Sequence, residues 1–262
     1  MIDFKYKKSY SVNDLAEIVR LLRAPGGCPW DAEQTHESIR RNFLEEAYEA
    51  VEAIDEADPV HLREELGDVL LQVVLHARME EEQGSFDLDA VADGICKKLI
   101  FRHPHVFGEV KAETSGDVLT LWEERKRLEK GQATHMDALE AVARNLPALW
   151  RAEKVQKKAK KAGFDWPDIS GAMEKLEEEL GELKTAVAEG SNVEEELGDL
   201  LFSAVNAARF LRADPEDTLN RATDKFIARF GKVEALAAQG DVPMTDMTIA
   251  QLDALWAQAK KA

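Results

Sequence analysis

The chain has 262 residues, of which 45% are hydrophobic and 32% are charged, and its formal net charge at pH 7 is −17. This length allows one large domain or two domains of ordinary size. So large an acidic excess argues against nucleic-acid binding through a general electrostatic footprint, because the phosphates would be repelled.

The cysteine count and the hydropathy of the sequence indicate where in the cell the protein is expected. The two cysteines, Cys28 and Cys96, predict neither a disulfide framework nor a zinc site. The sequence contains no run of about 18 apolar residues, and the segment MIDFKYKKSYSVND lacks the apolar stretch of a signal peptide. We therefore expect a cytoplasmic protein with no membrane span.

Helical periodicity dominates the chain from its beginning. An apolar stripe from Val12 to Leu22 predicts a first helix that starts after Ser11, a good N-cap, and stops before Pro25. Strand patterns are nearly absent, so the predicted fold class is all-α. Further helices are expected at about 37–56, 60–82, 87–102, 115–130, 137–161, 170–189, 193–211, 215–238 and 248–261.

The second half of the chain repeats the first. LEEAYEAVEAI, REELGDVLLQVV, CKKLIFR and LWEERK are followed later by LEEELGELKTAV, EEELGDLLFSAV, TDKFIARF and LWAQAK. Trp30 and Trp166 each precede the acidic helix of their half. Two copies are too few for a solenoid, so we predict two related helical domains, residues 1–131 and 132–262.

The acidic segments of the second half predict a cluster of carboxylates. Side chains three or four residues apart share one helix face, and a short loop at 189–192 should fold the two helices into an antiparallel hairpin. An apolar seam is expected, made by Leu176, Leu180, Leu183 and Val187 against Val193, Leu197, Leu200 and Leu201. The carboxylates that this hairpin would gather are Glu178, Glu179, Glu182, Glu196 and Asp199.

Crowded carboxylates need a counter-charge. Two like charges about 4 Å apart repel by roughly 4 kcal/mol at an effective dielectric near 20. Protonation or a bound cation relieves this repulsion. Ligands that are all oxygen favour a hard ion, so Mg²⁺ is predicted, with Mn²⁺ as a substitute.

The alternative is an ordinary solvated face, which is the commoner origin of acidic runs on helices. Recurrence of the pattern argues against it, as does an interior glycine at the same place each time, Gly67 and Gly198. Such a glycine indicates close approach of a helix or a ligand. The recurring residues form a second candidate site and comprise Glu45, Glu46, Glu49, Glu65 and Asp68.

Cations and aromatics recur at helical spacing in both halves. Lys225 and Arg229 stand four apart, as do Lys98 and Arg102, and Lys260 follows Trp256 by four. Such pairs suit phosphate contacts and base stacking. Ordinary surface salt bridges and a core tryptophan remain the alternative.

Other catalytic patterns are missing from the sequence. There is no G-x-x-x-x-G-K-[ST] loop and no G-x-S-x-G, and the six histidines are scattered. A di-iron bundle would need Glu-x-x-His on two core helices, whereas Glu33 to His36 stands alone.

Taken together, these segments resemble the MazG nucleoside triphosphate pyrophosphohydrolases in their two-domain bacterial form. The likeness rests on E-E-x-x-E followed by E-x-x-D, and extends to GCPWDAEQTHESIR, FRHPHVFGEV, LPALWRAEKVQKKAKKAGFDW and EEELGDLLFSAVNAARF. It implies Mg²⁺-dependent cleavage of NTPs and dNTPs, with weak base selectivity, to a monophosphate and pyrophosphate. It also implies a homodimer whose paired domains complete four-helix bundles.

The resemblance also implies roles for particular residues, mostly in the second half. Glu179, Glu182, Glu196 and Asp199 correspond to metal ligands, and Glu178 joins them as a catalytic carboxylate. Asn192 departs from the family, where a lysine can stand. The expected nucleotide contacts are Lys175, Glu178, Glu195, Lys225, Arg229, Trp256 and Lys260.

Two questions stay open at the level of sequence. The first half keeps its acidic residues, so either half could be active, although the resemblance favours the second. The hydrolysis could serve nucleotide-pool control or removal of damaged nucleotides. A rival class is a non-catalytic acidic helical protein that binds a basic partner without metal or nucleotide.

Overall fold

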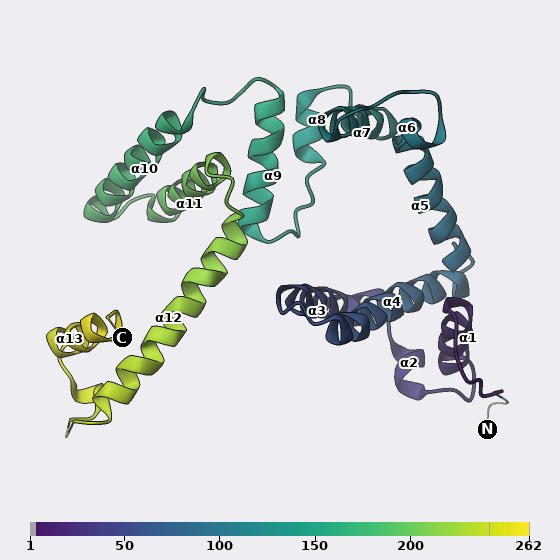
Figure 1. Cartoon of the computed structure of the whole chain (residues 1–262), viewed down its shortest axis with the longest axis horizontal. Helices are drawn as coiled ribbons and strands as arrows, with labels where there is room; N and C mark the ends of the chain where they lie inside the picture. Colours follow the sequence, from purple (N-terminus) through teal and green to yellow (C-terminus); the bar gives the residue numbers. More distant parts are fainter. Residues whose placement is uncertain (1–3, 241, 262) are drawn as a thin grey trace. The chain divides into compact units, whose positions relative to one another are not determined.

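A computed structural model describes residues 4–240 and 242–261 (Figure 1). Within these residues the chain forms thirteen α-helices and one 3₁₀ helix, and no strand, which confirms the predicted all-α class. The helices are α1 Val12–Arg23, α2 Pro29–Glu33, α3 His36–Asp55, α4 Pro59–Glu82, α5 Leu88–Arg102, α6 Pro104–Phe107, α7 Ser115–Glu129, α8 His135–Glu140, α9 Ala148–Lys161, α10 Ile169–Glu189, α11 Val193–Phe210, α12 Pro215–Ala237 and α13 Ile249–Ala259, with the 3₁₀ turn Met244–Asp246.

The helices belong to two compact units, Met1–Lys126 and Arg127–Ala262. The division falls within α7, a few residues before the boundary predicted at 131, which stays a prediction. In each unit the closest pairing joins two consecutive helices, α3 with α4 and α10 with α11.

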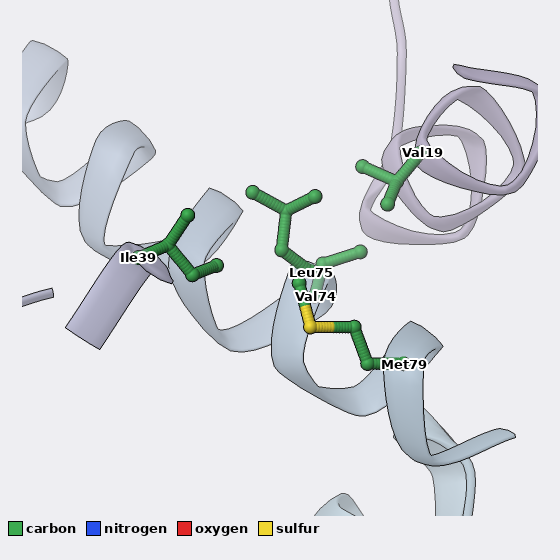
Figure 2. Close-up of a cluster of buried hydrophobic side chains, with 5 residues drawn as sticks. All are labelled: Val19, Ile39, Val74, Leu75 and Met79. Carbon is green, nitrogen blue, oxygen red and sulfur yellow. The ribbon is translucent and has the colours of Figure 1, made fainter. Parts of the chain in front are cut away.

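The core of the first unit forms where α1, α3 and α4 meet. Ser11 accepts a hydrogen bond from the Asp14 amide, and the Asp14 carboxylate accepts one from the Ser11 amide. This reciprocal cap starts α1 where the sequence predicted. The cluster of buried apolar side chains is shown in Figure 2 and consists of Val19, Ile39, Val74, Leu75 and Met79.

The second unit is built around α9. Its Gln156 amide donates to the carbonyl of Phe202 on α11 over 2.8 Å, and Trp150 donates to the Asp214 carboxylate that caps α12. One helix was predicted over 137–161, but two are present. α8 ends at Glu140, and α9 begins directly after Pro147, which disfavours helical geometry in the residue before it. The short helices α2 and α6, which each start at a proline, were also not predicted.

The α10–α11 seam differs from the predicted apolar seam. The buried residues of α10 are Ala172, Glu179 and Ala186, which recur every seven positions. Small side chains let the two helices approach closely. Half of the predicted leucine and valine seam is instead exposed in the single chain, namely Leu180, Val187, Leu197 and Leu201.

Met79→Ala should destabilise the first unit by about 2–5 kcal/mol, because truncating a buried side chain leaves a cavity. Met79 is 3% exposed, whereas Met136 on α8 is 58% exposed. The same change at Met136 should therefore cost less than about 0.5 kcal/mol. Urea-induced unfolding followed by circular dichroism measures both, and equal losses would contradict the placement of this core.

Candidate metal and nucleotide site

Local sequence sets the geometry of the α10–α11 hairpin. Asp168 caps α10 by accepting from the Ser170 amide. Gly190 ends the helix with a φ of 69°, a left-handed conformation that glycine adopts without steric cost. Asn192 follows with a φ of 53° and leads directly into α11. The reversal is therefore tight, and it sets the acidic turns of the two helices beside each other.

Three of the predicted metal ligands meet in this hairpin. Glu179 from α10 and Glu196 and Asp199 from α11 each present a carboxylate oxygen, and these oxygens all lie within 4.8 Å of one another. Glu179 is 5% exposed. Its Oε2 atom is buried and has no hydrogen-bond partner among the described residues. Such an atom is costly unless a further ligand satisfies it.

Glu182, the fourth predicted ligand, is not part of that close group, but it is electrostatically coupled to it. Loss of hydration, followed by the charges of Glu179 and Glu196, raises the pKa of the exposed Glu182 carboxyl. The repulsion predicted from the sequence is thus present in the folded hairpin. A bound cation would lower this pKa again.

Lys175 supplies the only close positive charge found at this cluster in the described part of the chain. Its ammonium lies 2.6 Å from a Glu179 oxygen and 2.9 Å from a Glu178 oxygen. These two carboxylates raise the pKa of Lys175. Lys175 therefore contacts the carboxylates expected at the site. Glu178 and Glu195 are exposed on α10 and α11.

The first unit gathers a matching cluster on α3 and α4. Carboxylate oxygens of Glu46, Glu49 and Glu65 lie within 4.8 Å of one another. Partial burial and the charges of Asp68, Glu49 and Glu65 raise the pKa of Glu46, so Asp68 also acts on this cluster. Glu45 is exposed beside it and adds a smaller repulsion.

A histidine that sequence reasoning passed over contacts this first cluster. His61 Nε2 lies 3.2 Å from a Glu65 oxygen, and its Nδ1 lies 3.1 Å from Glu56. The hydrogen bond to Glu56 and the nearby acids raise the pKa of His61. A useful signal was its register, since His61 precedes Glu65 by four residues just as Asn192 precedes Glu196.

The predicted cations of the second unit lie on α12 and α13. Lys225 and Lys260 are exposed, and Arg229 is half-buried. The Trp256 ring packs against Phe226, with the ring centroids 5.3 Å apart. In the described part of the chain no ion pair within 4.0 Å links Lys225, Arg229 or Lys260 to the carboxylate cluster.

The equivalent cations of the first unit are engaged differently. Arg102 is buried, and its guanidinium lies 5.1 Å from the centroid of the Trp122 ring. The Lys126 ammonium lies 4.7 Å from the same ring. Trp122 is thus held by cation–π contacts from its own chain. Lys98 is half-buried on α5.

The two interior glycines have no chain neighbour that explains them. A Cβ built on Gly67 or Gly198 meets nothing within 4 Å in the described structure. Helix packing inside the chain therefore does not require these glycines. The open space at these glycines would admit a ligand or a helix of a second protein copy.

No helix in the described residues is long and apolar enough to cross a membrane.

Residues 34–107 and 169–233 match the MazG nucleotide pyrophosphohydrolase domain. These segments contain α3 with α4 and α10 with α11, the two carboxylate-bearing hairpins.

Similarity to curated proteins extends over almost the whole chain. The chain is 45% identical to the nucleoside triphosphate pyrophosphohydrolase/pyrophosphatase MazG of Thermotoga maritima, covering 94% of each sequence. It is 42% identical to the nucleoside triphosphate pyrophosphohydrolase of Escherichia coli K12, covering 95% of this chain and 97% of that protein. It is also 47% identical to the uncharacterized protein YabN of Bacillus subtilis, covering 93% of this chain and 50% of that protein. The chain therefore belongs to the MazG nucleotide pyrophosphohydrolase family, with two MazG segments in tandem.

Proposed function

We propose that the α10–α11 hairpin hydrolyses nucleoside triphosphates to a monophosphate and pyrophosphate with the help of Mg²⁺. The enzyme class predicted from the sequence is confirmed by the relatives that carry this activity in their names over nearly the full chain. The observation that carries the site is the convergence of Glu179, Glu196 and Asp199, with a buried Glu179 oxygen lacking any partner.

The donor set fits a hard divalent cation. All of its atoms are carboxylate oxygens, and no cysteine or histidine joins the group. Loss of hydration and the charges of Glu179 and Glu196 raise the pKa of the neighbouring Glu182 carboxyl, and a bound cation would offset this effect. When bound, Mg²⁺ would neutralise charge on the triphosphate oxygens, and Mn²⁺ would substitute for it.

The remaining roles belong to residues of the chain. Glu179, Glu182, Glu196 and Asp199 would hold the metal, and Glu178 orients the attacking water and accepts its proton. Lys175 contacts the buried Glu179 carboxylate and supplies a positive charge beside it. Lys225, Arg229 and Lys260 neutralise charge on the phosphate oxygens, and Trp256 stacks on the base. Glu195 is a further polar contact of the nucleotide. Stacking on a π-face tolerates any base, so weak base selectivity follows.

The second unit is the better candidate for catalysis. In the first unit His61 already pairs with Glu65, and Trp122 is already covered by Arg102 and Lys126. Glu45, Glu46, Glu49, Glu65 and Asp68, with Lys98 and Arg102, then form a structural counterpart.

A homodimer would cover the apolar surface that the hairpins expose. Met173, Leu180 and Val187 stand seven residues apart on α10, and all three are exposed, as are Leu197 and Leu201 on α11. A stripe of this spacing is the seam of a helix bundle. Pairing with a second copy would turn each hairpin into a four-helix bundle. It would also bring a neighbouring helix towards Gly198, which has open space around it.

Glu196→Gln should lower turnover by at least about a hundredfold, because it removes a direct metal ligand and such losses exceed those of supporting residues. The matched control is Glu194→Gln, which makes the same change on an exposed residue of the same helix turn. Steady-state assays that detect pyrophosphate and monophosphate measure both variants. Release of inorganic phosphate would mean that another bond is cut.

The same assay assigns activity to one half of the chain. Glu65→Gln should leave turnover within about twofold of the wild type if the second unit carries the chemistry, because Glu65 lies in the other unit and distant sites act independently. A large loss with Glu65→Gln and none with Glu196→Gln would reverse the assignment.

Mg²⁺ should raise the unfolding midpoint of the wild type, and a slowly hydrolysed triphosphate analogue should raise it further. Ligands that bind only the folded state stabilise it by about 2.7 kcal/mol at a hundredfold excess over Kd. Glu196→Gln should lose the Mg²⁺ effect. A wild type that responds to neither ligand would favour the rival, an acidic interaction protein without catalysis.

Val187→Glu should convert the proposed dimer to a monomer, because it buries a charge in the apolar seam. Lys184→Glu is the control, since it adds the same side chain at another exposed position of α10. Light scattering after size exclusion measures the mass. A wild-type mass of one chain would contradict the dimer.

A further inference from the structure

Three polar side chains in the first unit join the start of α3 to α4, away from the carboxylate cluster. His36 is the first residue of α3, and His76 and Glu80 stand one turn apart on α4. His36 Nδ1 lies 2.6 Å from His76 Nδ1, and His36 Nε2 lies 2.8 Å from Glu80 Oε1. None of these residues belongs to the proposed catalytic machinery.

The two imidazole rings meet edge to edge. Their planes differ by 5° and their centroids lie 4.9 Å apart. Face-to-face rings stay separated by about 3.5 Å, which the 2.6 Å contact between nitrogens excludes. The distance between the ring centroids equals the distance between the two Nδ1 atoms plus the distance from each Nδ1 to the centroid of its own ring. The nitrogens therefore point head-on at each other, as in an N–H···N hydrogen bond.

The hydrogen bonds dictate where the protons lie. The Glu80 carboxylate only accepts, so His36 must donate to it from Nε2. His36 Nδ1 is then an acceptor, and His76 must donate from its own Nδ1. A first added proton goes to His76 Nε2 and leaves this bridge intact. A second would place N–H groups on both facing nitrogens and break it.

We propose that His36, His76 and Glu80 form a proton-sensitive latch, which fastens the start of α3 to α4 and opens when the histidine pair takes a second proton. The charged side chains that surround the latch do not provide another hydrogen bond between the start of α3 and α4. They are Glu37 and Arg40 on α3, Arg78, Glu81 and Glu82 on α4, and Arg23 on α1.

A second fastening at the same place limits the opening to α3. Arg23 donates to the backbone carbonyls of Asp31 and Gln34 and pairs with Glu82 over 2.9 Å. Arginine stays charged throughout the working range of pH. The contacts of Arg23 with Asp31 and Gln34 thus persist at low pH, and opening of the latch concerns the first turn of α3.

The sign of the pH dependence follows from proton counting. Burial and the neighbouring His36 lower the pKa of His76 below its ordinary value of 6.5. The unfolded pair can bind two protons at low pH, while the closed latch binds one. Stability of this contact is therefore complete above about pH 6.5 and is lost as the pH falls below it.

The first test reads the tautomers directly in the wild-type full-length chain. Long-range ¹H–¹⁵N NMR of histidine-labelled protein near pH 8 should show His36 protonated at Nε2 and His76 at Nδ1. His36→Gln and His76→Gln serve only to assign the signals. Protonation of His76 at Nε2 with a bare Nδ1 would overturn the latch.

The second test measures opening. Hydrogen exchange of peptides covering 34–43, corrected for intrinsic rates, should show protection falling by roughly tenfold per pH unit below the second protonation. In His76→Gln the protection should not change with pH, since an amide either donates to His36 or accepts from it. His135→Gln, the same change on an exposed histidine of α8, should behave as the wild type. Equal pH dependence in all three proteins would refute the proposal.

Discussion

Mutual repulsion of carboxylates is the interaction on which the rest of the molecule depends. The α10–α11 hairpin holds Glu179 almost fully buried beside Glu196 and Asp199, and a single lysine offsets only part of that charge. A fold selected for stability alone would place apolar groups there, because a buried charge without full pairing is costly. The cost is understandable if a divalent ion and a polyphosphate complete the site, as MazG family membership implies.

The carboxylate clusters of the two units contact different basic side chains. In the second unit Lys175 approaches from the same helix and leaves one Glu179 oxygen unpartnered. In the first unit His61 approaches from the α4 side and binds Glu65. The aromatic rings also have different neighbours. Trp122 is contacted by Arg102 and Lys126, whereas the Trp256 ring packs against Phe226 at an interplanar angle of 41°. The two units thus share a carboxylate cluster while its surroundings differ, and this difference supports the proposal that the second unit carries the chemistry.

Packing inside the α10–α11 hairpin includes small buried side chains, and larger apolar side chains lie on its surface. Ala172 and Ala186 let α10 lie close to α11, so the bulkier Leu180 and Val187 face outward. An apolar stripe on the outside of an acidic protein is unfavourable in water, and the proposed dimer would cover it. Assembly and chemistry are then linked, because the helices that carry the ligands also carry the proposed interface.

Periodicity and repetition in the sequence determined that the chain is helical, that its halves are related and that carboxylates gather on paired helices, since these depend on local spacing along a helix. The break at Pro147 was also written locally, although the long basic pattern over 137–161 concealed it. Only the tertiary structure decided which carboxylates come closest, that Glu182 stands beside the group of three, and that His61 rather than a lysine serves the first cluster. These outcomes depend on the rotation of one helix against another. Hydrophobic spacing had assigned the α10 seam to leucines and a valine, whereas the buried positions of α10 are Ala172, Glu179 and Ala186.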